Sequence, residues 1–101
     1  MRKLEDKSID VLFNIIASID NKEDCRNFFE DLCTIKELKD MAQRFETAVL
    51  LKKGQNYQKI SEVLGTRAAT ISRVSRCLNY GTGGYEKAIE TLDKMENGNE
   101  N

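Results

Sequence analysis

The chain has 101 residues, of which 40% are hydrophobic and 33% charged, and it has no proline and no histidine. These values indicate one soluble domain. A charged N-terminus without an apolar core excludes a signal peptide, and no apolar run approaches the roughly 20 residues of a membrane span, so we expect a cytoplasmic protein without membrane contact. The net charge of −1 conceals a basic segment, because residues 52–79 have six basic side chains and one acidic side chain.

The first half of the chain has apolar residues at helical spacing and predicts three helices. The first covers residues 4–19, and its broad apolar arc indicates that more than one of its sides is covered. The second covers residues 22–33 and begins after Asn21, a residue type that caps helices well. The third covers residues 35–53, after a capping box formed by Thr34 and Glu37.

The second half predicts three more helices, over residues 57–64, 68–79 and 85–95. Gly65 separates the first two, and a glycine-rich break over residues 81–84 precedes the third. The fold class is therefore all-α, with six helices in a single domain over residues 1–96 and a disordered tail over residues 97–101. The three cysteines, without histidine, form no metal-site pattern, and we expect three reduced, half-buried thiols and no cofactor.

Residues 57–79 have the pattern of a helix-turn-helix. Its first helix needs apolar residues that point inward, its turn needs a residue that accepts positive φ, and its second helix must pack back across the first. One register satisfies all three demands, with a predicted core of Ile60, Leu64, Gly65, Ile71 and Val74.

The other side of this motif is basic and small, as a major-groove probe requires. Small residues let the start of the second helix approach base edges, hydroxyl groups reach phosphates or bases, and arginines suit phosphate or guanine. Side chains on the first helix hold the DNA backbone. The predicted DNA-binding residues are Gln58, Lys59, Arg67, Ala68, Ala69, Thr70, Ser72, Arg73 and Arg76.

Residues 64–78, with the sequence LGTRAATISRVSRCL, resemble the Trp repressor superfamily. The continuation to Tyr85 is similar to its YerC/YecD branch, and the likeness covers most of the chain, from about Leu12 to Leu92. The resemblance implies a Trp repressor-like transcription regulator, with a repressor's role, that binds double-stranded DNA. It also implies an intertwined homodimer whose two motifs reach successive major grooves about 34 Å apart.

The resemblance further implies a candidate effector pocket formed by Thr34, Arg44, Arg73 and Cys77. In the tryptophan-binding members the position of Val74 is glycine. Valine adds three carbons where the indole ring would lie, and overfilling a packed site costs about 1–3 kcal/mol. We therefore predict that tryptophan is not the corepressor, which leaves either no effector or a different small molecule.

Two other functions compete with DNA binding. Catalysis is disfavoured because the sequence has no histidine, no nucleophile beside an evident base, no phosphate loop and no metal cluster. The main alternative is a helical protein-interaction module that keeps the fold without binding DNA. Salt dependence separates the two, because binding through arginine and lysine weakens steeply as salt rises.

Overall fold

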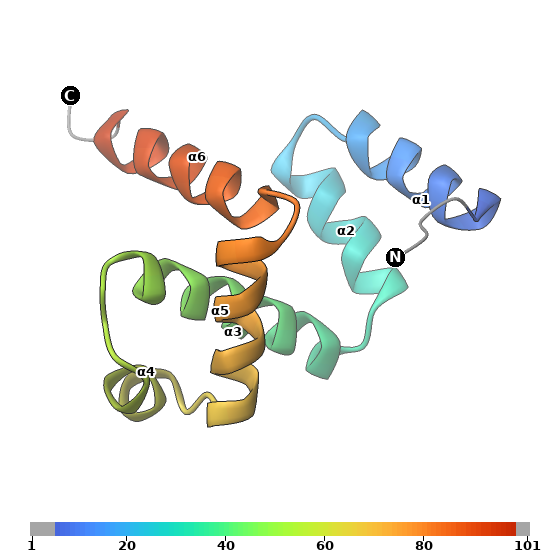
Figure 1. Cartoon of the computed structure of the whole chain (residues 1–101). Helices are drawn as coiled ribbons and strands as arrows, with labels where there is room; N and C mark the ends of the chain where they lie inside the picture. Colours follow the sequence, from blue (N-terminus) through green and yellow to red (C-terminus); the bar gives the residue numbers. More distant parts are fainter. Residues whose placement is uncertain (1–5, 99–101) are drawn as a thin grey trace. The chain divides into compact units, whose positions relative to one another are not determined.

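The computed structural model describes residues 6–98, which contain six helices and no strand. The helices are α1 (Lys7–Ser18), α2 (Lys22–Leu32), α3 (Ile35–Lys52), α4 (Tyr57–Leu64), α5 (Ala68–Tyr80) and α6 (Gly84–Gly98), shown in chain order in Figure 1. The predicted all-α class is confirmed. None of the helices within residues 6–98 combines the length and the apolar composition that a membrane crossing demands.

The chain divides into two compact units, residues 1–38 and residues 39–101. Helices α1 and α2 belong to the N-terminal unit, and α4, α5 and α6 belong to the C-terminal unit. Helix α3 begins in the first unit and continues through the second. The single domain over residues 1–96 stays a prediction.

The helices of the N-terminal unit begin at side-chain caps. The Asp6 carboxylate accepts a hydrogen bond from Ser8 N at 2.7 Å and caps α1, which starts three residues after the expected Leu4, a residue outside the described range. Asn21 Oδ1 accepts from Asp24 N at 2.8 Å, as its position predicted. These local bonds fix the helix starts because each satisfies an amide that has no partner within the helix.

A capping box starts α3, as the sequence predicted. Glu37 N donates to Thr34 Oγ1 at 3.1 Å, and Thr34 N donates to Glu37 Oε1 at 2.8 Å. Thr34 therefore has a structural task at the helix start, inside the N-terminal unit. Its predicted part in an effector pocket stays a prediction.

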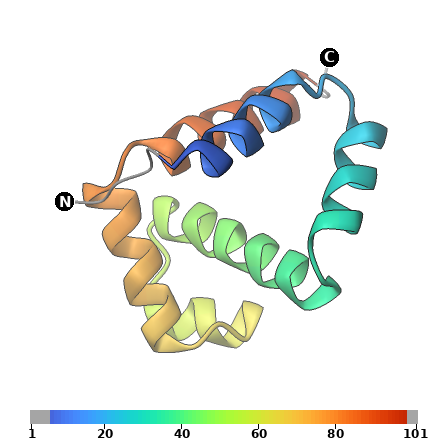
Figure 2. The ribbon, with the colours of Figure 1, turned by 90° about the vertical axis from the view of Figure 1, so that its right-hand side faces the viewer.

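The C-terminal unit contains the buried core. Ala48 of α3, Val74 of α5 and Ile89 of α6 form one cluster. Half-buried side chains of the same helices pack against this cluster: Phe45, Val49, Leu51, Leu78 and Tyr85. Figures 1 and 2 show the result, with α4 and α5 meeting at a short turn and α5 crossing α3. The second helix of the helix-turn-helix, α5, thus packs against α3 and α6.

Two predictions need correction. A disordered tail was predicted over residues 97–101, but Asn97 and Gly98 belong to α6. Residues 99–101 lie outside the described range. No proline stops the helix before Gly98, so it continues past Met95. Cys25 and Cys33 are half-buried as expected, but Cys77 is exposed. Cys77 lines a surface cavity beside Val74, which leaves its side chain accessible to water.

Candidate nucleic-acid interface

The turn between α4 and α5 has the geometry that the sequence predicted. Helix α4 ends at Leu64, and Gly65 follows with φ 73° and ψ 14°, in the left-handed region. The Gly65 amide donates to Ser61 O at 2.8 Å and closes the helix end. Two further residues lead to Ala68, the first residue of α5. A side chain at Gly65 would meet no other atom, so the backbone conformation alone explains the glycine.

Three of the four apolar residues predicted for the motif's core are fully buried. Ile60 and Ile71 have 0% of their surface exposed, and Val74 has 1%. Leu64, the fourth, is half-buried. The backbone of Leu64 also links the end of α4 to α3, because the Leu64 carbonyl accepts a hydrogen bond from Gln43 Nε2 at 2.9 Å.

The predicted DNA-binding residues form an exposed surface around α5, apart from Thr70, which is half-buried. Within residues 6–98, no hydrogen bond or ion pair engages the side chains of Arg67, Arg73 or Arg76. Helix α5 itself contains no acidic residue. Three arginines that no described side chain engages remain available for an external anion.

The N-terminus of α5 differs from the other helix starts described above. Its N-cap residue, Arg67, makes no side-chain hydrogen bond to the first turn, whereas Asp6, Asn21 and Asn56 each cap their helices. The first-turn amides of α5 therefore have no side-chain acceptor, and Arg67 directly precedes them. Helix N-termini of this kind favour phosphate, because the helix dipole and the free amides attract negative charge.

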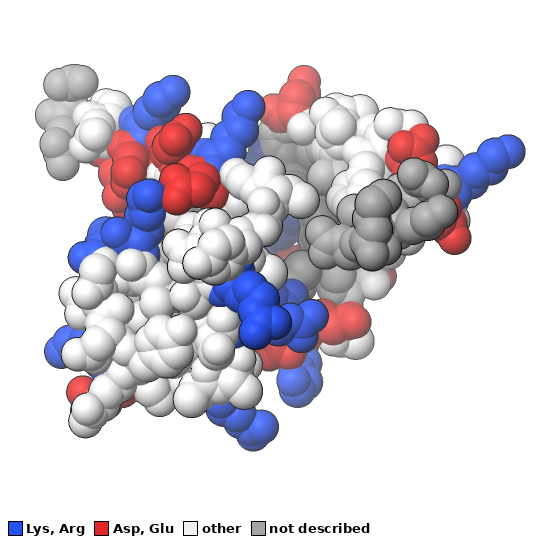
Figure 3. Space-filling model, viewed as in Figure 1, with Lys and Arg blue, Asp and Glu red and all other residues white. Residues whose placement is uncertain are grey.

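Charge is distributed unevenly over the C-terminal unit. In Figure 3 a group of basic side chains lies beside α5, while acidic side chains gather over α6. Helix α6 contains Glu86, Glu90, Asp93 and Glu96. Glu86 Oε1 is paired with Lys52 Nζ at 2.8 Å, which brings the end of α3 to the start of α6. The acidic helix would repel a phosphate backbone, so only the α5 side of this unit suits DNA.

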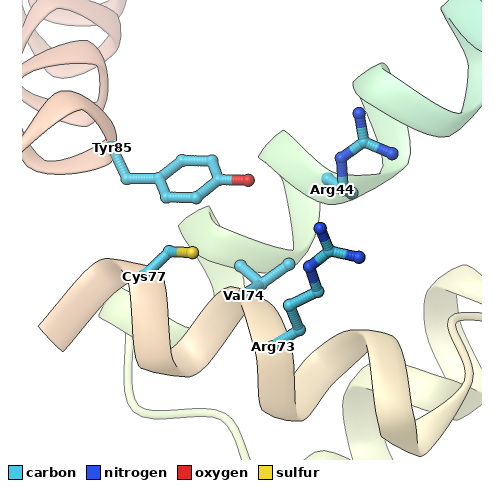
Figure 4. Close-up of a pocket in the computed structure, with 5 residues that line it drawn as sticks. All are labelled: Arg44, Arg73, Val74, Cys77 and Tyr85. Atoms are coloured by element: carbon cyan, nitrogen blue, oxygen red, sulfur yellow. The ribbon is translucent and has the colours of Figure 1, made fainter. Parts of the chain in front are cut away.

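A cavity of about 270 Å³ lies beside α5 and is lined by Arg44, Arg73, Val74, Cys77 and Tyr85. Figure 4 shows both guanidinium groups on one side of it, with the Tyr85 ring reaching in from α6 and Val74 between α5 and α3. Two neighbouring cations without a partner among the described residues suit an anionic group. Three of the four residues predicted for an effector pocket thus line one cavity.

Sequence reasoning missed four residues that shape this region: Gln43, Thr47, Thr66 and Tyr85. Thr47 and Thr66 have no exposed surface at all. Of these four, only Thr66 could have been found from the sequence, because it directly follows the turn glycine, Gly65. A residue at that point of a helix-turn-helix packs against the helix beneath the turn, here α3. The pairing of Gln43 and Thr47 with the turn spans about twenty residues and leaves no local pattern.

The described residues therefore define an all-helical protein with a helix-turn-helix whose second helix is basic and exposed. The family model described as Trp repressor protein matches residues 7–93. The chain belongs to the Trp repressor family, as its motif around Gly65 predicted.

Individual relatives agree with this assignment. The uncharacterized protein YerC of Bacillus subtilis is 49% identical over 94 residues, which span 93% of this chain and 90% of the relative. A TrpR-like protein from Eubacterium eligens has 42% identity and a TM-score of 0.83, covering 89% of this chain and 93% of its own. A proposed Trp repressor from Staphylococcus aureus has 37% identity and a TM-score of 0.82, covering 89% and 90%. The predicted likeness to YerC and the Trp repressor-like fold are confirmed.

Proposed function

We propose that this protein binds double-stranded DNA sequence-specifically through α5, as a homodimeric transcription regulator with a repressor's role. The observation that carries the proposal is the state of α5: exposed, free of acidic residues, and flanked by arginines with no partner within residues 6–98. Membership of the Trp repressor family supports the same role. Small residues at the start of α5, Ala68 and Ala69, leave room for base edges.

The exposed apolar residues of the N-terminal helices support a homodimer. Val11, Phe13 and Ile15 of α1 are each about half exposed, and neither α1 nor α2 contains a buried residue. A short chain that leaves such side chains in water is better stabilised when a second copy covers them. Two copies would also present two recognition helices to a DNA site with twofold symmetry.

The DNA proposal is tested by replacing Arg73 and Arg76 together with alanine. The probe is a labelled duplex selected by the unmodified protein from a random-sequence pool, and affinity is measured over a range of salt concentrations. We expect affinity to fall at least about thirtyfold, and the salt dependence to become shallower, because two cationic contacts are lost. Thermal stability should change by less than about 0.5 kcal/mol, since both side chains are exposed.

The matched control replaces Lys87 and Lys94 of α6, which removes the same two positive charges from another exposed helix. Affinity should then change little. If the Arg73 and Arg76 variant binds as well as the control, α5 is not the recognition helix. If no duplex is selected and a protein partner binds independently of salt, the chain is instead the interaction module considered above.

We further propose that tryptophan is not the corepressor. Val74 is 1% exposed and belongs to the core cluster, so its side chain cannot withdraw from the cavity to admit an indole ring without disturbing Ala48 and Ile89. Calorimetric titration with tryptophan should give no saturable heat. Saturable binding in the micromolar range would contradict this part of the proposal.

A further inference from the structure

A buried polar contact joins α3 to the turn of the helix-turn-helix. Thr47 Oγ1 lies 3.1 Å from Thr66 Oγ1, and both residues have no exposed surface. Gln43, one helical turn before Thr47, donates from Nε2 to the Leu64 carbonyl at 2.9 Å. The two bonds therefore hold the chain on either side of Gly65, the residue at which its direction changes. We call Gln43, Thr47 and Thr66 the turn clamp.

The direction of the hydroxyl bond follows from the other partner of Thr47. Thr47 Oγ1 lies 2.8 Å from the Gln43 carbonyl, which can only accept, so the single hydroxyl proton of Thr47 is committed there. Thr66 must then be the donor and Thr47 the acceptor. Loss of Thr47 would leave a buried donor without a partner, whereas loss of Thr66 would leave only an acceptor lone pair. The two residues are therefore not equivalent.

Packing alone does not explain this arrangement. Two buried hydroxyls can be replaced by methyl groups of the same shape with little change in stability, because folding only exchanges their bonds to water for a bond to each other. A bond between hydroxyls is directional, however, and it permits fewer orientations of the turn than an apolar contact does. The clamp lies next to Arg67 and Ala68, where α5 begins.

We propose that Gln43 and Thr47 are positioning residues for DNA recognition, which fix the turn and hence the orientation of α5 on α3 in the free protein. This inference rests on the proposed function, because it assigns the clamp an effect on DNA affinity. Helix α5 is thereby held in its binding orientation before DNA arrives, and less ordering is required when the complex forms.

The test uses Thr47→Val, Thr66→Val and the double variant, each of which keeps the side-chain shape. Affinity is measured on the duplex selected by the unmodified protein, at a temperature where every variant is folded. We expect a loss of about two- to tenfold for Thr66→Val and for the double variant, with an unchanged salt dependence. Thr66→Ser retains the hydroxyl and should restore the affinity.

Thermal unfolding distinguishes a positioning role of the clamp from a packing role. The double variant should unfold near the temperature of the unmodified protein, and above Thr47→Val, because it leaves no buried donor without an acceptor. The matched control is Thr91→Val, since Thr91 Oγ1 likewise donates to the carbonyl four residues earlier, Lys87 O at 3.0 Å, but on an exposed face of α6. This control should leave DNA affinity unchanged.

Hydrogen exchange in the free protein provides a readout that needs no DNA. The amides of residues 67–73 should exchange faster in Thr66→Val and in the double variant, but not in Thr66→Ser or Thr91→Val. If the double variant keeps both the affinity and the exchange protection of the unmodified protein, the clamp is only packing and the inference is wrong. If the unmodified protein selects no duplex, the proposed function fails, and faster exchange would still show that the clamp orders the turn.

Discussion

The two compact units of the chain differ in how far they bury their apolar side chains. In the C-terminal unit Ile60, Ile71 and Val74 are almost completely buried, and α5 packs against helices of the same chain. In the N-terminal unit, by contrast, α1 has Phe13 53% exposed and Val11 58% exposed, and α2 has no buried residue either.

In the proposed function, this difference in burial assigns DNA binding to the C-terminal unit and dimerisation to the N-terminal unit. A DNA-binding surface needs side chains held in fixed positions, and the C-terminal unit fixes them by burial and by the turn clamp. A dimer contact needs apolar surface that is left open in a single chain, and α1 provides it. The following predictions test the difference between the units, starting with the largest expected effect.

Removing core volume from the C-terminal unit should have the largest effect on stability. Ile71→Ala is expected to lower the free energy of unfolding by about 2–5 kcal/mol, because the fully buried side chain leaves a cavity. Ile15→Ala removes the same atoms from a position in α1 that is 47% exposed, and should cost about 1 kcal/mol in the dilute protein. Urea unfolding of both variants measures the difference, and equal losses would contradict the contrast between the units.

A charge on the exposed face of α1 should weaken the dimer. Phe13→Asp is expected to raise the dimer dissociation constant at least tenfold, because it removes an aromatic contact and buries a carboxylate in the interface. Asn14→Asp adds the same charge at the neighbouring exposed position and should have a much smaller effect. Sedimentation equilibrium measures both constants. An unchanged dimer in Phe13→Asp would place the interface elsewhere.

Two equivalent helix caps, one in each unit, should differ in their effect on stability. Loss of one should lower the global free energy of unfolding, and loss of the other should destabilise only its own helix. Asn21 caps α2 and Asn56 caps α4, each through a 2.8 Å bond to a backbone amide. We expect Asn56→Ala to lower the global free energy of unfolding by about 1 kcal/mol, because α4 carries the buried Ile60.

Asn21→Ala should act locally instead, because α2 has no buried residue to link its opening to the rest of the chain. Hydrogen exchange should show faster exchange in α2 with a smaller change in global unfolding. Serine at either position keeps a capping oxygen and is the control. A purely local effect of Asn56→Ala would mean that α4 is less tightly coupled to its core than its burial indicates.

The smallest effects should appear at opposite ends of the pH range. The Ser8 hydroxyl and the Ser8 and Ile9 amides donate to Asp6 and lower the pKa of that carboxyl. A lowered folded-state pKa stabilises α1 above the ordinary aspartate pKa, and this stabilisation is lost as pH falls through the folded value. Amide exchange in α1 should therefore quicken in acid, and Asp6→Asn should abolish that dependence.

In the C-terminal unit the hydrogen bond and charge of Glu86 raise the pKa of the Lys52 ammonium group. A raised folded-state pKa stabilises the α3–α6 contact below the ordinary lysine pKa, and this is lost as pH rises through the folded value. The start of α6 should loosen in alkali, as followed by the amide signals of residues 84–88. Glu86→Gln should remove this dependence, and its persistence would assign the effect to another group.

Most of the secondary structure was predictable because its causes are local. Asn21, Asn56 and the Thr34–Glu37 box set helix starts through bonds that span three residues. Gly65 set the turn because its backbone requires positive φ. The exceptions also have a local cause, since α6 continued to Gly98 where no residue type forces an end. The half-burial of Leu64 could not be predicted, because spacing predicts a helix face but not how completely that face is covered.

The amino-acid sequence was enough to predict the family, the helices, the glycine turn and the basic second helix of the motif, since each depends on neighbouring residues or on a short motif. The folded chain was needed to show that Gln43 and Thr47 meet the turn, 21 and 19 residues away along the chain. It was also needed to show that Tyr85 of α6 joins Arg44 in lining one cavity beside α5. Such contacts arise from how helices pack, and helix packing brings together residues whose spacing in the sequence shows no period.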